Sequence, residues 1–258
     1  MIMKPLFQLG SQSKKSKERI GAYQFDSDDP HQIRQTIQEN FDHDSELLDI
    51  FTRNKGATVH KWHHYIPLYD RYFSSFRGKK IKFLEIGVSN GGSLQMWREY
   101  FGEDAIIYGI DIDPNCERLN GIAGQVRIGS QTDGDFLEEV LQEMGGIDIV
   151  LDDGSHHMKH VPKSLELLFP NLNLGGIYMI EDLHTAYWKR FGGGYNAKAN
   201  FFRAVFDIVN DIHHWYHDGR QRNQYVSDSC TGVHIHDSIV VFEKNNVVRP
   251  AHSRIGSE

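Results

Sequence analysis

The sequence predicts an α/β fold, a doubly wound Rossmann-like sheet with helices on both faces. Short apolar runs alternate with helix-like segments from about residue 80 to residue 182, which is typical of parallel strands joined by crossover helices. The chain then closes with VHIHDSIVVFEKN, which we interpret as two strands joined tightly around His236-Asp237. We therefore expect a parallel sheet that ends in an antiparallel hairpin.

Each element is assigned from its apolar spacing. Apolar runs that end at glycine or acidic residues predict strands over 80–87, 105–113, 125–129, 147–153 and 175–182. Apolar residues three or four positions apart predict helices over 93–101, 135–144, 160–172 and 201–217.

The N-terminal part has a different character. Two short amphipathic helices fit HQIRQTIQENFDHDSELLDIFTR, and WHHYIPLYDRYFSSF carries an aromatic helix face that we expect in the core. Residues 1 to about 30 are polar and basic, and we expect a mobile arm there. The predicted organisation is an arm and helical cap over 1–57, followed by the main domain over 58–258.

Composition narrows the class of partner. A formal net charge of -7 gives no broad electrostatic surface for nucleic acid or an anionic membrane. The two cysteines, Cys116 and Cys230, form no CxxC motif and no zinc-like spacing. Neither a signal peptide nor a membrane span is apparent, so we expect a cytoplasmic protein.

A glycine cluster follows the first strand. In FLEIGVSNGGS, Gly87 and its neighbours permit a tight turn and close approach of a ligand to backbone N–H groups. The second strand ends in IDID, where Asp111 (or Asp113) could accept both hydroxyls of a ribose. After the third strand, GSQTD offers Ser130 and Gln131 for polar contacts near an adenine. Together these residues predict a nucleoside site.

Carboxylates also end the fourth and fifth strands. Asp153 follows one strand and Glu181-Asp182 the next, and neighbouring parallel strands would bring all three to one edge of the sheet. Hard oxygen ligands of this kind suit Mg²⁺, or Mn²⁺. The alternative is that these acids cap a helix or pair with lysine or arginine.

Histidines lie beside these acids. His156 follows Asp153 by three residues, and a neutral imidazole beside a metal-activated hydroxyl could accept its proton. His157 and His184 are competing candidates. No 2-His-1-carboxylate pattern supports iron chemistry.

The ordered motifs LEIGVSNGGS, GIDIDP, GSQTD and LDDGSH resemble those of class I S-adenosylmethionine-dependent methyltransferases. The resemblance implies a seven-stranded sheet whose last strand is antiparallel. It also implies that Glu85, Gly87, Ser93 and Asp111 hold the methionine and ribose parts, with Gln131 near the adenine and Asp152 near the methionine end; Ser130 and Asp153 complete the expected cofactor set.

IVLDDGSHHMKHV, IEDLHTAYW and HKWHHYIPLYDRYF further resemble the metal-dependent sugar O-methyltransferases of macrolide and polyketide tailoring. That resemblance implies Asp153, Glu181 and Asp182 as Mg²⁺ ligands and His156 as the catalytic base. A departure is that the usual Thr-Asp-Lys before the first helix reads Arg53-Asn54-Lys55.

The leading hypothesis is methyl transfer from S-adenosylmethionine to a hydroxyl of a sugar or glycosylated small molecule, by a homo-oligomer. Two alternatives stay open. The acceptor could be a catechol or other phenol, whose vicinal oxygens would chelate Mg²⁺ equally well. The chain could also be a non-catalytic S-adenosylmethionine-binding subunit.

Overall fold

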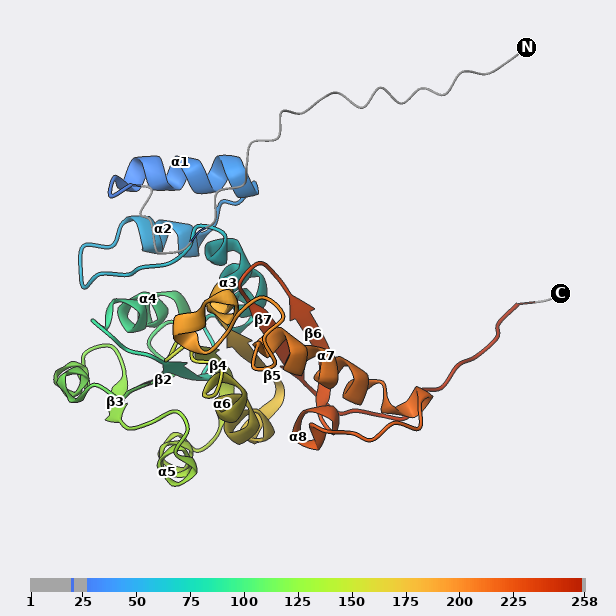
Figure 1. Cartoon of the computed structure of the whole chain (residues 1–258). Helices are drawn as coiled ribbons and strands as arrows, with labels where there is room; N and C mark the ends of the chain where they lie inside the picture. Colours follow the sequence, from blue (N-terminus) through green and yellow to red (C-terminus); the bar gives the residue numbers. More distant parts are fainter. Residues whose placement is uncertain (1–19, 21–26, 257–258) are drawn as a thin grey trace, which may run out of the picture.

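The structure is a computed structural model that describes residue 20 and residues 27–256 (Figure 1). The predicted N-terminal arm falls almost entirely outside the described residues. Within the described part, no helix is both long and apolar enough to cross a membrane.

One seven-stranded sheet forms the centre of the fold, in the order β3-β2-β1-β4-β5-β7-β6 (Figure 1). Strands β1 to β5 are parallel, and β7 runs antiparallel between β5 and β6. This confirms the predicted doubly wound sheet and its closing hairpin. The strands are β1 Lys82–Ile86, β2 Ile106–Asp111, β3 Gln125–Ile128, β4 Ile147–Asp152, β5 Leu172–Ile180, β6 Cys230–Ile235 and β7 Val240–Lys244.

Helices cover both faces of the sheet, with a separate apolar core on each side. On one face lie α1 Pro30–Phe41, α2 Glu46–Thr52, α3 Tyr65–Phe73 and α4 Gly92–Phe101. On the other lie α5 Gly134–Met144, α6 Val161–Leu168, α7 Phe201–Ile212 and α8 Gln224–Ser227. The aromatic face predicted for α3 packs in the first core, where Tyr69 and Phe73 are fully buried.

Short 3₁₀ segments complete the described elements. They are η1 Ser74–Phe76, η2 Pro114–Leu119, η3 Phe169–Asn171, η4 Leu183–Tyr187, η5 Lys189–Phe191 and η6 His214–Tyr216. Two of them replace the ends of predicted helices. The helix expected over 160–172 ends at Leu168, because Pro170 cannot continue it and Leu172 already begins β5.

The helix expected over 201–217 ends at Ile212 and gives way to η6. Its last turn is closed by side chains: the ring Nδ1 of His213 lies 2.7 Å from the carbonyl oxygen of Val209, and that of His214 lies 3.0 Å from the carbonyl oxygen of Asp211. These contacts satisfy carbonyls that a continuing helix would otherwise bond.

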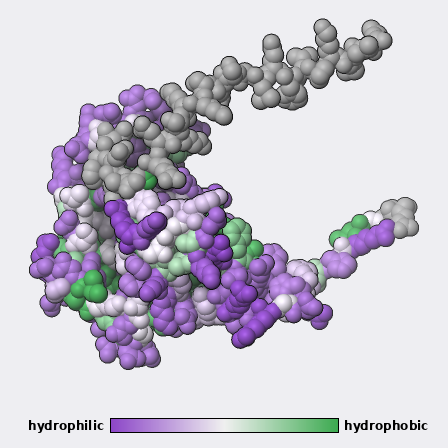
Figure 2. Space-filling view, viewed as in Figure 1, coloured by the Kyte–Doolittle hydropathy of each residue, from purple (hydrophilic) through white to green (hydrophobic). Residues whose placement is uncertain are grey.

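The surface in view is largely hydrophilic, with small scattered hydrophobic areas (Figure 2). The carboxyl ends of β1, β2, β4 and β5 meet at one edge of the sheet, because these strands are parallel and adjacent. In open α/β sheets, ligands bind outside this edge. Candidate functional residues, among them Asp111, Asp153 and Asp182, line a cavity at this edge.

Candidate active site

The turn from β1 into α4 is shaped by glycine and held by Asp111. Gly87 has φ +95°, and a Cβ there would lie 2.2 Å from the carbonyl oxygen of Asp153, so only glycine fits. Asp111 Oδ2 accepts hydrogen bonds of 2.9 Å from the backbone N–H groups of both Val88 and Ser89. Asp111 Oδ1 accepts a third bond, from Asp113 N. The β2 carboxylate thus fixes the glycine turn.

The same hydrogen bonds keep Asp111 ionised. Burial alone would raise the pKa of its carboxyl group, but the three backbone N–H donors outweigh burial and lower the pKa. Of the two acids considered for this position, Asp111 is the one at the strand end. Asp113 instead caps η2 by accepting from Asn115 N.

A cavity of about 360 Å³ lies over this turn. Its lining brings together segments far apart in the sequence: the glycine turn with Ser93, the end of β2, both acidic strand ends, and the connection between α2 and α3. We call that last segment, residues 53–64, the α2–α3 connection. The predicted residues that line the cavity are Gly87, Ser93, Asp111, Asp153, His156, Glu181 and Asp182.

Four other predicted cofactor residues, Glu85, Ser130, Gln131 and Asp152, do not line this cavity. Glu85 is fully buried and accepts from Ser93 Oγ (2.8 Å) and Trp97 Nε1 (3.2 Å). Gln131 is buried and bonds both Asp152 and the backbone N–H of Ser155. Ser130 contacts Thr132 in the loop after β3. Glu85 thus contacts the lining residue Ser93, and Gln131 lies against the lining residue Gly154.

Asp152 and Asp153 point to opposite faces of the sheet, as successive residues at a strand end do. Asp152 faces α6, and its Oδ2 accepts hydrogen bonds from Ser164 Oγ of α6 (2.6 Å) and from Tyr178 OH of β5 (3.0 Å). It is buried in that network and does not line the cavity. Asp153 points to the opposite face of the sheet and lines the cavity.

A buried lysine joins the acidic strand ends. Lys61 Nζ, on the α2–α3 connection, lies 2.6 Å from Asp153 Oδ2 and is also paired with Glu181 Oε1. The other oxygen of Glu181 accepts a hydrogen bond from Tyr69 OH. Burial raises the pKa of Glu181 to about 7, an effect that the Lys61 ammonium opposes.

Asp153 and Asp182 each direct one carboxylate oxygen toward His156. Asp182 Oδ1 accepts from Tyr65 OH at 2.8 Å, while Asp182 Oδ2 lies 3.7 Å from His156 Nε2. Asp153 Oδ1 lies at the same distance from His156 Nε2. Each aspartate therefore uses one oxygen for a structural partner and directs the other at the imidazole. The backbone at His156 and Asp182 supports this, since both residues adopt positive φ angles (53° and 58°) that re-aim their side chains.

These residues form a group able to hold a metal ion. One ligand atom from each of Asp153, His156 and Asp182 lies within 4.8 Å of the others. The two carboxylate oxygens suit Mg²⁺ or Mn²⁺, with solvent or substrate oxygens completing the shell. Glu181, predicted as a third ligand, is here engaged by Lys61 and Tyr69. The group of Asp153, His156 and Asp182 thus fits a divalent cation, whereas Glu181 is bound by Lys61 and Tyr69.

Of the competing histidines, His156 lines the cavity and His157 does not. His157 Nδ1 accepts from Lys159 N. His184 lies on the far side of Asp182, with its Nδ1 2.7 Å from Ser238 Oγ. Burial lowers the pKa of His184. Geometry therefore favours His156 as the imidazole nearest both aspartates.

Sequence reasoning missed three residues of the site: Lys61, Tyr65 and Tyr69. They recur at four-residue intervals along the α2–α3 connection and α3, a spacing that was available in the sequence. The aromatic pattern of this segment predicts only a core face for the two tyrosines. Both are indeed fully buried, but each also donates its hydroxyl hydrogen to a site carboxylate.

Comparisons with known proteins give matches over most of the chain. Residues 84–183 match the family described as "Methyltransferase domain". The chain is 35% identical over 199 residues to a tetracenomycin rhamnosyl 3'-O-methyltransferase of Streptomyces olivaceus, covering 71% of this chain and 50% of that protein. It is 34% identical to the mycinamicin VI 2''-O-methyltransferase of Micromonospora griseorubida, covering 70% and 48%.

Among solved structures, the chain is similar to the MycE methyltransferase of the mycinamycin pathway in complex with Mg, SAH and mycinamycin VI. The TM-score is 0.70 at 32% identity, covering 78% of this chain and 54% of that one. The chain spans about half the length of the curated relatives that it matches. The similarity therefore concerns about half of each of those proteins.

Proposed function

The chain carries a class I methyltransferase domain that resembles sugar O-methyltransferases, and we propose that it moves the methyl group of S-adenosylmethionine to a sugar hydroxyl of a glycosylated small molecule, with the help of Mg²⁺. The observation that supports this most is the meeting of Asp153, His156 and Asp182 beside a cavity that the glycine turn and Asp111 line. The relatives' names supply the acceptor class.

The cofactor would lie in the 360 Å³ cavity, with its ribose toward Asp111 and its methionine part toward Gly87 and Ser93. Asp111 is ionised and fixed by the turn that it organises, so it could accept from ribose hydroxyls with little rearrangement. When bound, S-adenosylmethionine supplies an activated methyl group and Mg²⁺ supplies Lewis-acid polarisation of acceptor oxygens.

The chain's own residues would do the rest. Asp153 and Asp182 would hold the cation, and Glu181 would join them if it left Lys61. His156 Nε2, 3.7 Å from both aspartates, would accept the proton of the acceptor hydroxyl. The neighbouring carboxylates would stabilise the resulting imidazolium. Most of the remaining rate gain would come from orientation of the two substrates.

Titration calorimetry tests the binding steps. We expect S-adenosylmethionine to bind the wild type in EDTA and in Mg²⁺, and a separate heat of Mg²⁺ binding that Asp153→Asn removes. Absence of cofactor binding would refute the methyltransferase proposal. Cofactor binding without any metal response would refute the roles given to Asp153 and Asp182.

Methyl transfer is then measured with a panel of rhamnosides and catechols. His156→Gln should lower kcat by about 10²- to 10⁴-fold with cofactor affinity unchanged, whereas His157→Gln, the matched control, should retain activity. Equal losses in both variants would contradict His156 as the base. Transfer to catechols alone would replace the sugar acceptor by a phenol.

A further inference from the structure

The α2–α3 connection brings a cation of its own into the acidic site. Lys61 is 7% exposed overall, and only 3% of its side chain is accessible. Its ammonium contacts one oxygen each of Asp153 and Glu181. A buried ammonium is costly unless it is paired, and so are converging carboxylates. Lys61 and these acids therefore stabilise one another.

A divalent cation would be held by the same carboxylate groups. Asp153 Oδ1 and Asp182 Oδ2 already face His156, but both oxygens of Glu181 are engaged, one by Lys61 and one by Tyr69. A full set of three carboxylate ligands would require Glu181 to exchange Lys61 for the metal. Two positive charges close together would also repel each other strongly in a buried setting.

We propose that Lys61 is a tethered counter-cation that competes with the divalent metal for Glu181 and Asp153, and that metal binding releases it together with the α2–α3 connection. This inference rests on the metal site of the proposed function and adds a residue that regulates it.

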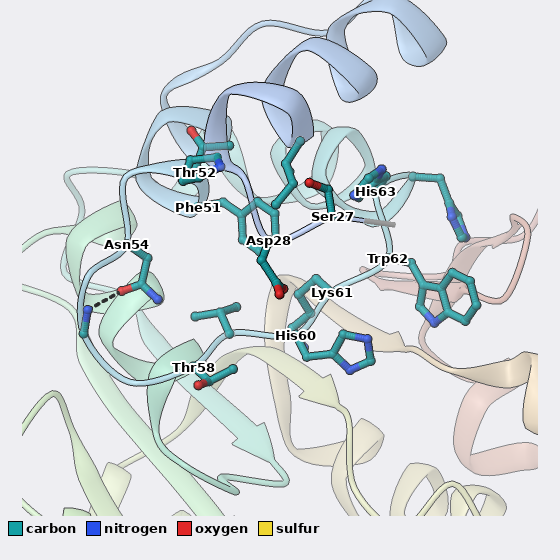
Figure 3. A pocket seen from close by; sticks show the side chains of 15 residues that line it. Ser27, Asp28, Phe51, Thr52, Asn54, Thr58, His60, Lys61, Trp62 and His63 are labelled. Carbon is teal, nitrogen blue, oxygen red and sulfur yellow. Dashed lines mark hydrogen bonds between the residues drawn. The ribbon is translucent and has the colours of Figure 1, made fainter. Parts of the chain in front are cut away.

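The fold offers room for the released side chain. Residues 58–62 line the cofactor cavity and also a second cavity, of about 520 Å³. Figure 3 shows this second cavity between the α1–α2 region and the α2–α3 connection, with Lys61 between His60 and Trp62 and with Asp28 across the cavity. An ammonium that leaves Glu181 could therefore move into a space that already contains a carboxylate.

The same geometry links metal and cofactor. Because Thr58, His60 and Lys61 form one wall of the cofactor cavity, release of Lys61 would loosen that wall when metal binds. The metal-free protein would keep the wall closed by the Lys61 pairs. Metal binding would then replace the Lys61 ammonium with the metal ion and change access to the cofactor cavity.

Mn²⁺ titration of the full chain tests the competition. We expect Lys61→Met to bind Mn²⁺ on the order of tenfold more tightly than the wild type. Lys55 is an exposed lysine on the same connection, and Lys55→Met should bind Mn²⁺ with the affinity of the wild type. Without metal, Lys61→Met should melt at a lower temperature than Lys55→Met, and saturating Mn²⁺ should remove the difference.

Equal or weaker Mn²⁺ binding by Lys61→Met, while the wild type binds, would overturn the inference and leave the proposed function intact. Absence of Mn²⁺ binding by both the wild type and Lys61→Met would overturn this inference and the proposed function alike. Should Lys61→Met fail to fold, hydrogen exchange of the wild type decides. Exchange of amides in residues 56–64 should rise when Mn²⁺ is added, and unchanged or slower exchange would overturn the release of Lys61.

Discussion

The hydroxyl group of Tyr65 donates a hydrogen bond of 2.8 Å to Asp182 Oδ1 and accepts one of 3.1 Å from the backbone N–H of the same residue. Asp182 has a positive φ angle, and these two bonds hold its backbone and its carboxylate together. Oδ2 is thereby directed at His156. Partners of this kind fix the orientation of a metal-binding carboxylate.

Tyr65→Phe should therefore weaken the proposed metal binding by about 10- to 100-fold while the fold is retained. Loss of this donor removes one of the bonds that orient the Asp182 carboxylate and allows it to rotate. Calorimetric Mg²⁺ titration measures the effect. Tyr72→Phe is the matched control, since Tyr72 also lies on α3 but bonds His236, away from the acids. Equal metal affinity in both variants would show that Tyr65 does not orient Asp182.

Asp111→Asn should weaken S-adenosylmethionine binding by about 10- to 100-fold. Asparagine keeps one acceptor oxygen, so it cannot accept from Val88, Ser89 and Asp113 together. The glycine turn would lose its anchor and the proposed ribose contact its charge. Asp113→Asn is the control, because that side chain caps η2. A cofactor affinity that fell equally in both variants would contradict the distinction between the two acids.

Glu85 makes the stability of the metal-free protein depend on pH. Burial raises the pKa of its carboxyl group to about 7, while Lys61 opposes the shift and Asp153 adds to it. A group whose pKa is higher in the folded state stabilises the fold at low pH. That contribution is complete below about pH 4.5 and is lost as pH rises to about 7.

Glu85→Gln removes this dependence, because the amide is neutral at every pH. The free energy of unfolding of Glu85→Gln, relative to wild type, should rise by on the order of 3 kcal/mol between pH 4 and pH 8. Urea unfolding in EDTA at several pH values measures it, with the exposed Glu138→Gln as the control. A constant difference for Glu85→Gln would contradict a shifted pKa.

The fold was predictable because its signals are local. Strands β1, β2, β4 and β5 each contain a short apolar run, and their alternation with helices along the chain indicates a parallel sheet, whose order is β3-β2-β1-β4-β5-β7-β6. Errors occurred where local signals compete, as at Pro170, where a helix-like pattern continues but proline ends the helix. The closing hairpin was recognisable from its own two strands.

The site was predictable only in part, because its contacts are long-range. The carboxylates stand at strand ends, so topology alone brings Asp153 and Asp182 together. Lys61 lies 92 residues before Asp153 and 120 before Glu181, and no local pattern connects them. Asp152 and Asp153 look equivalent in sequence, yet alternation at the strand end sends one to α6 and the other to the cavity.

Gly87 links the glycine turn to the acidic site, and a substitution there should affect both. In Gly87→Ala, the new Cβ would meet the carbonyl oxygen of Asp153 at 2.2 Å, in addition to the strain of φ +95°. Gly175→Ala is a matched control, since Gly175 has φ +83° but nothing within 4 Å of its Cβ position. The control isolates the cost of the backbone conformation alone.

We expect Gly175→Ala to lower the free energy of unfolding by about 1–2 kcal/mol and to leave cofactor and metal binding unchanged. Gly87→Ala should cost more and should also weaken both ligands, because relief of the clash must move either the turn that Asp111 holds or the backbone of Asp153. Urea unfolding and calorimetric titration of both variants separate the two effects. Unimpaired binding in Gly87→Ala would mean that the turn and Asp153 move apart without consequence for the proposed site.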